Sequence, residues 1–294
     1  MKFLMSLYRS PQTRTGLILL TFVVLVALAA PLLAPFSPVN VDPSARLLPP
    51  LSRVVASGTQ SDASAVHAET ALHLLGTDSV GRDVLSRLIY GSRLSLTVGF
   101  LAVLISAVFG SLVGSLSGYW GGWVEASSAW LIDVQLSFPF LLLAIFLLGA
   151  LGGGTLAVVL VLALGTWVNY ARIVRAQVLS IKNQGYVEAA HATGAGTLRI
   201  LFVHILPNTL SPICVVGSFS MALAILTEAG LSFLGVGLDP STPSWGTMLN
   251  DGRDYLLTAW WIATMPGIAI GVTVLGVTLF GEGLRELLDP RGLR

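Results

Sequence analysis

The sequence is poor in charged residues. Only 11% of its 294 residues are Asp, Glu, Lys or Arg, whereas soluble domains average about 25%. The few charges are clustered, so several long apolar stretches contain none, and the mean hydropathy is +0.82. This distribution excludes an ordinary soluble protein and is typical of a chain that crosses a membrane several times.

Three further features are missing or weak. The net charge is only +1, which argues against a nucleic-acid partner because such proteins present a strongly basic face. Cys214 is the single cysteine, so no disulfide can form within the chain. The four histidines do not combine with Cys or acidic residues at metal-binding spacing, and we therefore expect neither a metal site nor a cofactor.

Catalytic motifs are absent as well. The sequence has no GxSxG, no HExxH and no P-loop of the form GxxxxGK[ST], the motifs of serine hydrolases, zinc proteases and nucleotidases. We therefore do not expect an enzyme, and the chain cannot hydrolyse ATP in the usual way by itself. The missing motifs also disfavour a membrane-embedded hydrolase.

Six segments are long enough to cross a membrane, which takes about 17–25 mostly apolar residues. None contains Asp, Glu, Lys or Arg, and together they predict an all-α, polytopic protein with six transmembrane helices. The first follows three basic residues, as in a signal peptide, but its apolar run is long for one. The fifth can extend past Glu228 towards Gly237. The segments are Leu17–Ala34, Leu94–Gly118, Val134–Leu151, Thr155–Ala171, Asn208–Thr227 and Tyr255–Gly281.

The distribution of Lys and Arg predicts that both termini are cytoplasmic, because positive residues concentrate in inner loops. Residues 1–16 and 284–294 are then cytoplasmic ends, and residues 35–93 form an extracytoplasmic segment. Within that segment, Gly81–Arg93 alternates apolar and basic positions at roughly helical spacing, which predicts an interfacial helix on the outer leaflet, with an ordinary loop as the alternative. Residues 94–283 form a five-helix core that includes a cytoplasmic loop over residues 183–206.

One polar stretch, GYVEAAHATGAGTLRILFVHILPN (Gly185–Asn208), interrupts the apolar segments and is called the elbow below. Helix formers over Tyr186–Ala192 are followed by glycines that permit a sharp reversal. Thr197 is placed to cap a second short helix, and Pro207 disfavours helix at the residue before it. Two short helices at an angle are expected, and a solvated loop is the alternative.

The elbow resembles the EAA loop in permease subunits of ATP-binding-cassette importers. The resemblance rests on Glu188-Ala189-Ala190, on Gly194 and on the Leu206-Pro207 pair. His204 replaces the apolar residue usual two positions before that pair, as in the peptide-permease branch. In this family the loop forms a coupling helix that docks on the ATPase. The resemblance thus implies an ATPase-coupling role for Glu188, Ala189, Ala190, His191, Gly194, Ala195, Leu206 and Pro207.

Three other stretches, His73–Leu96, Leu231–Arg253 and Leu284–Arg291, resemble dipeptide and oligopeptide permeases of the C-subunit type. The resemblance implies an importer-permease (MetI-like) core in the bacterial inner membrane, and a di- or oligopeptide substrate. It also implies a second, different permease subunit, two ATPase subunits and an extracytoplasmic solute-binding protein as partners. Related permeases carry nickel or glutathione, so these substrates stay open.

Asp133 and Glu228 lie near the ends of the third and fifth segments. Acidic residues in membrane segments are candidates for a function, so both are candidates for pore-lining or gating residues. Local polar contacts or headgroup-level solvation are the alternative. An ion-coupled secondary transporter would need such acids near the middle of the bilayer, where neither lies.

Overall fold

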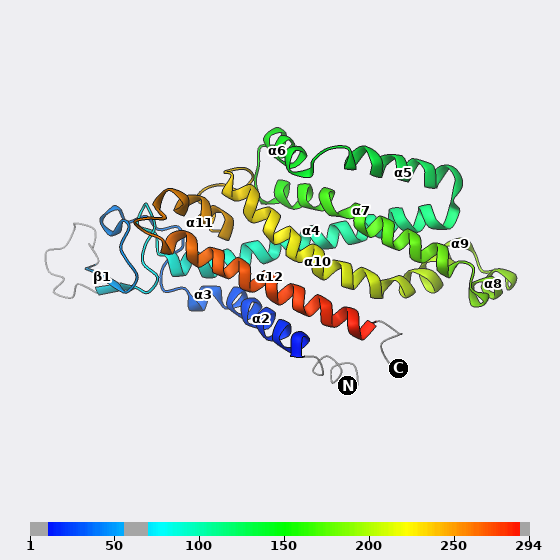
Figure 1. Ribbon diagram of the computed structural model, residues 1–294, viewed down its shortest axis with the longest axis horizontal. Coiled ribbons are helices and arrows are strands. Elements are labelled where there is room, and N and C mark those ends of the chain that lie inside the picture. Colours follow the sequence, from blue (N-terminus) through cyan, green and yellow to red (C-terminus); the bar gives the residue numbers. More distant parts are fainter. Residues whose placement is uncertain (1–10, 56–69, 289–294) are drawn as a thin grey trace.

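Helices dominate the part of the chain that the computed structural model describes, residues 11–55 and 70–288 (Figure 1). The elements are α2 (Pro11–Leu28), α3 (Ala30–Leu33), η1 (Pro43–Ala45), β1 (Ser52–Val55), β2 (Thr70–His73), α4 (Val84–Trp120), α5 (Gly122–Leu136), α6 (Phe140–Leu151), α7 (Thr155–Ile181), α8 (Gly185–Ala192), α9 (Thr197–Arg199), η2 (Ile200–Ile205), α10 (Leu206–Phe233), α11 (Trp245–Gly252), η3 (Arg253–Tyr255) and α12 (Trp261–Leu288).

Among the described residues, five helices are long and apolar enough to cross a membrane, and α5 and α6 make a sixth span if the bent pair is counted as one. The prediction of six spans is confirmed in this sense. The predicted third helix over Val134–Leu151 is wrong, because α5 ends at Leu136 and α6 starts at Phe140 at an angle of 88°. Pro139 separates them, since proline disfavours helix at the preceding residue.

The second span begins earlier than predicted. Asp83 caps α4 by accepting a hydrogen bond from the Ser86 amide at 2.7 Å, and the helix continues without a break to Trp120. A helix is thus present over most of the predicted Gly81–Arg93 stretch, but it forms the first turns of α4 and not a helix of its own. Gly91 lies in these turns without ending the helix, and it packs against the indole of Trp245.

A small antiparallel sheet was not predicted. Strands β1 and β2 pair with Ser52 opposite His73 and Val55 opposite Thr70. Each strand has only four residues, too few for a visible period in the sequence. The all-α prediction therefore holds for the spans, and the hairpin is a local exception outside them.

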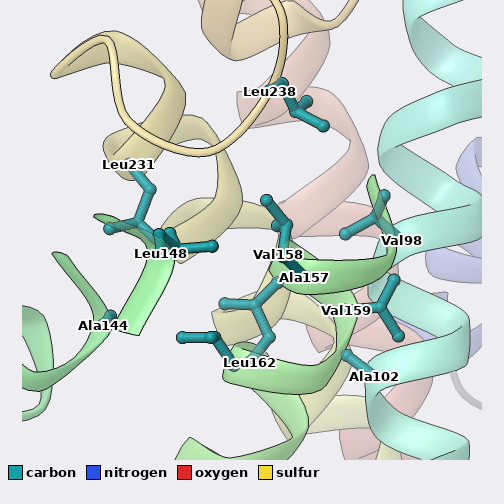
Figure 2. Packing of buried hydrophobic residues seen from close by; sticks show 11 residues of the cluster. Val98, Ala102, Ala144, Leu148, Ala157, Val158, Val159, Leu162, Leu231 and Leu238 are labelled. Carbon is teal, nitrogen blue, oxygen red and sulfur yellow. The ribbon is translucent and has the colours of Figure 1, made fainter. Parts of the chain in front are cut away.

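Glycines hold α4 against α7. A Cβ atom at Gly110 would lie 2.3 Å from the carbonyl oxygen of Trp167, and one at Gly114 would lie 2.4 Å from that of Ala171. Any larger residue would push the helices apart, as in other membrane helix pairs with small residues four apart. Beside this pair, a buried apolar cluster joins α4, α6, α7 and α10 (Figure 2).

Figure 1 shows which elements share an end of the bundle. α8 lies at the end where α2 begins and α12 finishes, whereas β1, α3 and α11 lie at the opposite end. The elbow, the start of α2 and the end of α12 are therefore on the same side of the bundle.

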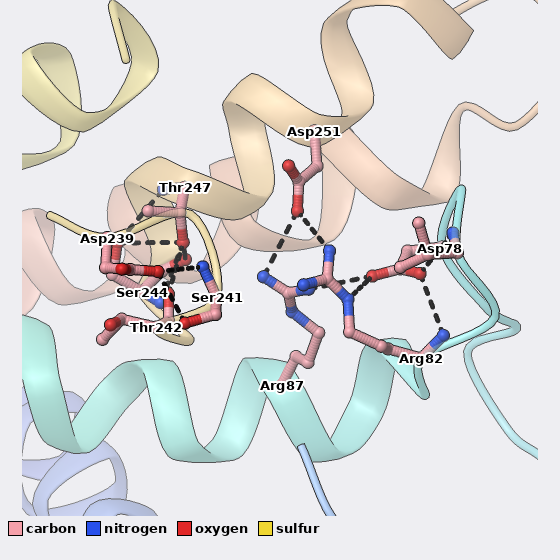
Figure 3. Close-up of polar contacts among 10 residues, drawn as sticks. Asp78, Arg82, Arg87, Asp239, Ser241, Thr242, Ser244, Thr247 and Asp251 are labelled. Atoms are coloured by element: carbon pink, nitrogen blue, oxygen red, sulfur yellow. Dashed lines mark hydrogen bonds and ion pairs between the residues drawn. The ribbon is translucent and has the colours of Figure 1, made fainter. Parts of the chain in front are cut away.

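A buried ion cluster ties the opposite end together (Figure 3). Asp78 accepts hydrogen bonds from Arg82 at 2.6 Å and from Arg87 at 2.9 Å. Asp251 in α11 binds the same two arginines, at 2.8 and 3.2 Å. The cluster thus joins two stretches, His73–Leu96 and Leu231–Arg253, whose contact the sequence did not predict.

Candidate functional site

The helix α8 is held in place by its apolar side. Val187 is completely buried and Ala190 nearly so. Both pack in a cluster with the last turns of α7 and with η2. The other buried members of this cluster are Val174, Val178, Ile181, Ile200, Leu201 and Ile205. The amphipathic spacing of Val187 and Ala190, three residues apart, therefore fixes α8 against the two spanning helices that flank the elbow.

The other side of α8 is exposed to solvent. Glu188, Ala189 and His191 are exposed, and so is Gly194 just beyond the helix. The EAA triplet is thus divided, because its third residue, Ala190, faces the buried cluster. Ala190 therefore lies on the packed side of α8, apart from the exposed Glu188 and Ala189. Three other residues predicted to couple are not on this helix. Ala195 and Leu206 are half-buried against the same cluster, and Pro207 is exposed in the first turn of α10.

Gly194 ends α8 with a left-handed turn. Its φ angle is +80°, and nothing lies within 4 Å of the place a Cβ atom would take. The amide of Ala195 donates to the carbonyl of Ala190 and that of Gly194 donates to His191, both at 3.0 Å. This is the Schellman arrangement that favours glycine at this position. Glycine is therefore required by the backbone angle and not by crowding.

The chain after the turn differs from the prediction. Thr197 is the first residue of α9 and Gly196 is its cap, without a side-chain hydrogen bond, so the predicted cap at Thr197 is wrong. The helix then passes through the π-helical turn η2 and continues into α10. Pro207 does not break the helix, although it lies at the start of α10, which follows directly after the π-helical turn η2.

The two acidic candidates have different surroundings. Glu228 is completely buried, and its carboxylate accepts hydrogen bonds from Ser95 at 3.1 Å and Ser232 at 2.9 Å. It thus links α4 to α10 and has no exposed surface in this structure. Asp133 is exposed in α5 and lines a cavity between α4, α5 and α7. The structure does not bring the two residues together.

The sequence matches a family of transport proteins. The family described as the inner membrane component of binding-protein-dependent transport systems matches residues 110–293, and the N-terminal transmembrane domain of oligopeptide transport permease C matches residues 2–50. The chain belongs to the first family. It is therefore a permease subunit and not an enzyme by itself, and the prediction of an ABC importer permease is confirmed.

Known permeases resemble this permease over most of its length. The di/tripeptide transport system permease protein DppC of Pseudomonas aeruginosa is 41% identical, over 94% of this chain and 87% of that protein. The dipeptide transport system permease protein DppC of Haemophilus influenzae is 40% identical, over 94% and 89%. The glutathione transport system permease protein GsiD of Pectobacterium atrosepticum is 41% identical, over 76% and 74%.

A solved structure shares the fold. A chain of the MetNI methionine ABC transporter, in an inward-facing conformation, superposes with a TM-score of 0.56 at 19% identity. The match covers 69% of this permease and 96% of that chain. The predicted MetI-like core is thereby confirmed as a fold.

Proposed function

We propose that this permease carries short peptides across the bacterial inner membrane and that α8 is its contact with a partner ATPase. The observation that carries the proposal is the division of α8 into two sides. Val187 and Ala190 anchor it in the membrane-helix bundle, while Glu188, Ala189 and His191 stay exposed at its tip. A helix that is packed on one side and exposed on the other is suited to transmit a movement.

The mechanism follows from that connection. ATP binding draws two ATPase subunits together, and the docked α8 moves with them. Because α8 shares a buried cluster with α7 and η2, its displacement reorients the spanning helices between inward and outward openings. ATP shifts this equilibrium only through its different affinity for the two states, so the energy must pass through the exposed side of α8.

The remaining partners complete the transporter. A second permease subunit supplies the other half of the pathway, and an extracytoplasmic binding protein delivers the substrate to the end that carries α11. Both termini and α8 are cytoplasmic in this arrangement. The names of the DppC relatives support a di- or tripeptide, and the GsiD relative keeps glutathione, itself a tripeptide, as the second candidate. Membership of the family excludes the ion-coupled secondary transporter.

Site-directed cross-linking tests the contact. A photoreactive residue is placed at Ala189 in the complete transporter, and the adduct is identified by mass spectrometry. The matched control is Leu257, which is fully exposed and lies between α11 and α12 at the opposite end. An adduct with an ATPase subunit from position 189 and none from position 257 is expected. If neither position gave an adduct with an ATPase subunit, the proposed contact would be refuted.

A further inference from the structure

A cavity of about 140 Å³ lies between α4, α5 and α7. Gly114 and Ile132 are among the residues that line it, together with four charged side chains: Glu125, Asp133, Arg172 and Arg175. The lining is therefore neutral overall but carries two charges of each sign. Neither the elbow contacts nor the ion cluster near α11 involves these residues.

Only half of this charge is satisfied. Arg175 forms an ion pair with Glu125, and its Nε atom is buried without a hydrogen-bond partner among the described residues. Within the same residues, Asp133 and Arg172 make no ion pair, either with each other or with a third group. Asp133 and Arg172 therefore line the same small cavity without forming an ion pair.

The surface of α5 beside the cavity is apolar. On α5, Trp130, Leu131 and Val134 are exposed beside Asp133, at 66%, 43% and 38%. A charged side chain facing acyl chains is strongly disfavoured, so charged residues in membrane proteins face water, a partner or a ligand. An exposed Asn169 lies three residues before Arg172 on α7, which places a second polar group on the same side of that helix.

We propose that this cavity binds the charged ends of a zwitterionic peptide during its passage, a proposal that rests on the proposed function. The peptide carboxylate accepts hydrogen bonds from the guanidinium of Arg172, and its ammonium group donates to Asp133. Guanidinium groups are suited to carboxylates because their donors are planar and fixed. A single site for both ends explains how separated charges of opposite sign remain unpaired in one cavity.

The volume of the cavity and its position along α7 indicate which part of a peptide it can bind. The cavity is smaller than the 300–1,000 Å³ typical of sites that enclose a whole ligand, so it holds the ends of the backbone while the side chains project outwards. The cavity therefore recognises the terminal ammonium and carboxylate groups of the peptide and not its side chains. It lies towards the end of α7 that leads into α8, which is the exit side in the proposed orientation.

The test is protection of a cysteine at the cavity. Ala129 lines the cavity, and Ala129→Cys is made with Cys214→Ser, because Cys214 is exposed. The complete transporter in lipid nanodiscs is labelled with a charged methanethiosulfonate reagent, with and without alanyl-alanine. At ten times its dissociation constant the dipeptide should slow labelling by about tenfold, by mass action. The C-terminal amide and the N-acetylated dipeptide should protect much less.

A second variant shows which charge is responsible. Arg172→Gln should raise the dipeptide concentration needed for protection by about tenfold to a hundredfold, as expected for one lost charge-assisted hydrogen bond. Arg93→Gln is the matched control, since Arg93 is also an exposed arginine but lies near the other end of α4. It should leave protection unchanged.

Three results would overturn the proposal: equal protection by the amide, no protection by alanyl-alanine, or a cysteine that the partner permease shields in every state. Uptake of alanyl-alanine by the unmodified transporter is measured in parallel. Uptake without protection would refute the site and leave the peptide function standing, whereas no uptake would refute the function itself.

Discussion

The Nε2 atom of His191 lies 3.2 Å from the phenolic oxygen of Tyr119, and the two rings stack with centroids 6.3 Å apart. This contact joins the exposed helix α8 to the end of α4. Lys182 adds a second link nearby by donating to the carbonyl of Gly118 at 3.0 Å. A movement of α8 therefore reaches α4 as well as α7 and α10.

Replacing Tyr119 by Phe should loosen α8 without unfolding the bundle. The lost hydrogen bond is worth about 0.5–1.5 kcal/mol, so amide hydrogen exchange in Gly185–Ala192 should speed up by up to about tenfold, since local opening reports such energies. Tyr90→Phe, near the other end of α4, is the control. Unchanged exchange in α8 would show that Tyr119 does not hold it.

The glycine contact between α4 and α7 predicts a difference between two identical substitutions. Gly114→Ala places a methyl group 2.4 Å from the Ala171 carbonyl, and overpacking of this kind costs about 1–3 kcal/mol. Gly149→Ala, in α6 with open space around it, should be neutral or up to about 1 kcal/mol stabilising. Heating the purified transporter and immunoblotting the soluble fraction measures both. Equal stability of the two variants would contradict the packing described.

Glu228 should matter for stability more than for transport. Glu228→Ala leaves the hydroxyls of Ser95 and Ser232 without their buried acceptor, at a cost of about 1–3 kcal/mol for each unsatisfied group. Glu228→Gln keeps the volume and one carbonyl oxygen, so its uptake should stay close to normal. The same heating assay and an uptake assay separate the effects. A Glu228→Gln transporter that is stable but inactive would favour a gating role.

Asp251 should make stability depend on pH in the acidic range. Burial raises the pKa of its carboxyl from 3.8 to about 6, and the attraction of Arg82 opposes the shift only in part. Between these values the folded chain binds a proton that the unfolded chain has released, so the free energy of unfolding falls as the pH rises. The contribution of Asp251 is therefore fully present below about pH 4 and lost above about pH 6.

The control for this prediction is Asp251→Asn, which cannot titrate. The original transporter should lose stability relative to this variant as the pH is raised from 4 to 6, whatever other groups titrate in both. Measured at several pH values in the heating assay, a constant difference between the two proteins would show that the carboxyl does not titrate there.

The spans could be predicted from the sequence because a run of apolar residues without charge has few other structures available to it. Which side of α8 packs against the bundle and which is exposed was harder to predict from the sequence. The sequence marked Glu188-Ala189-Ala190 as one unit, but only the packing against Ile200 and Leu201 reveals that Ala190 is an anchor. The break at Pro139 was visible as a proline, whereas its 88° angle depends on how α5 and α6 pack.

Contacts between distant stretches could not be predicted at all. Arg82 and Arg87 read as surface charges in the sequence, and only the fold brings Asp251 within 2.8 Å of Arg82. The same holds for Asp133 and Arg172, which are 39 residues apart and meet at one cavity because α5 folds back along α7. No local pattern distinguishes such residues from solvated ones.

The most direct measurement of the central claim is peptide uptake and ATP hydrolysis by Gly194→Asp in the complete, reconstituted transporter. Gly152→Asp is the matched control, because Gly152 has the same φ of +80° and equally open surroundings but lies in the loop after α6. A charge in a packed contact costs at least about 1.4 kcal/mol, or tenfold. Uptake should therefore fall tenfold or more in Gly194→Asp while hydrolysis continues and Gly152→Asp transports normally. Normal uptake by Gly194→Asp would contradict coupling through α8.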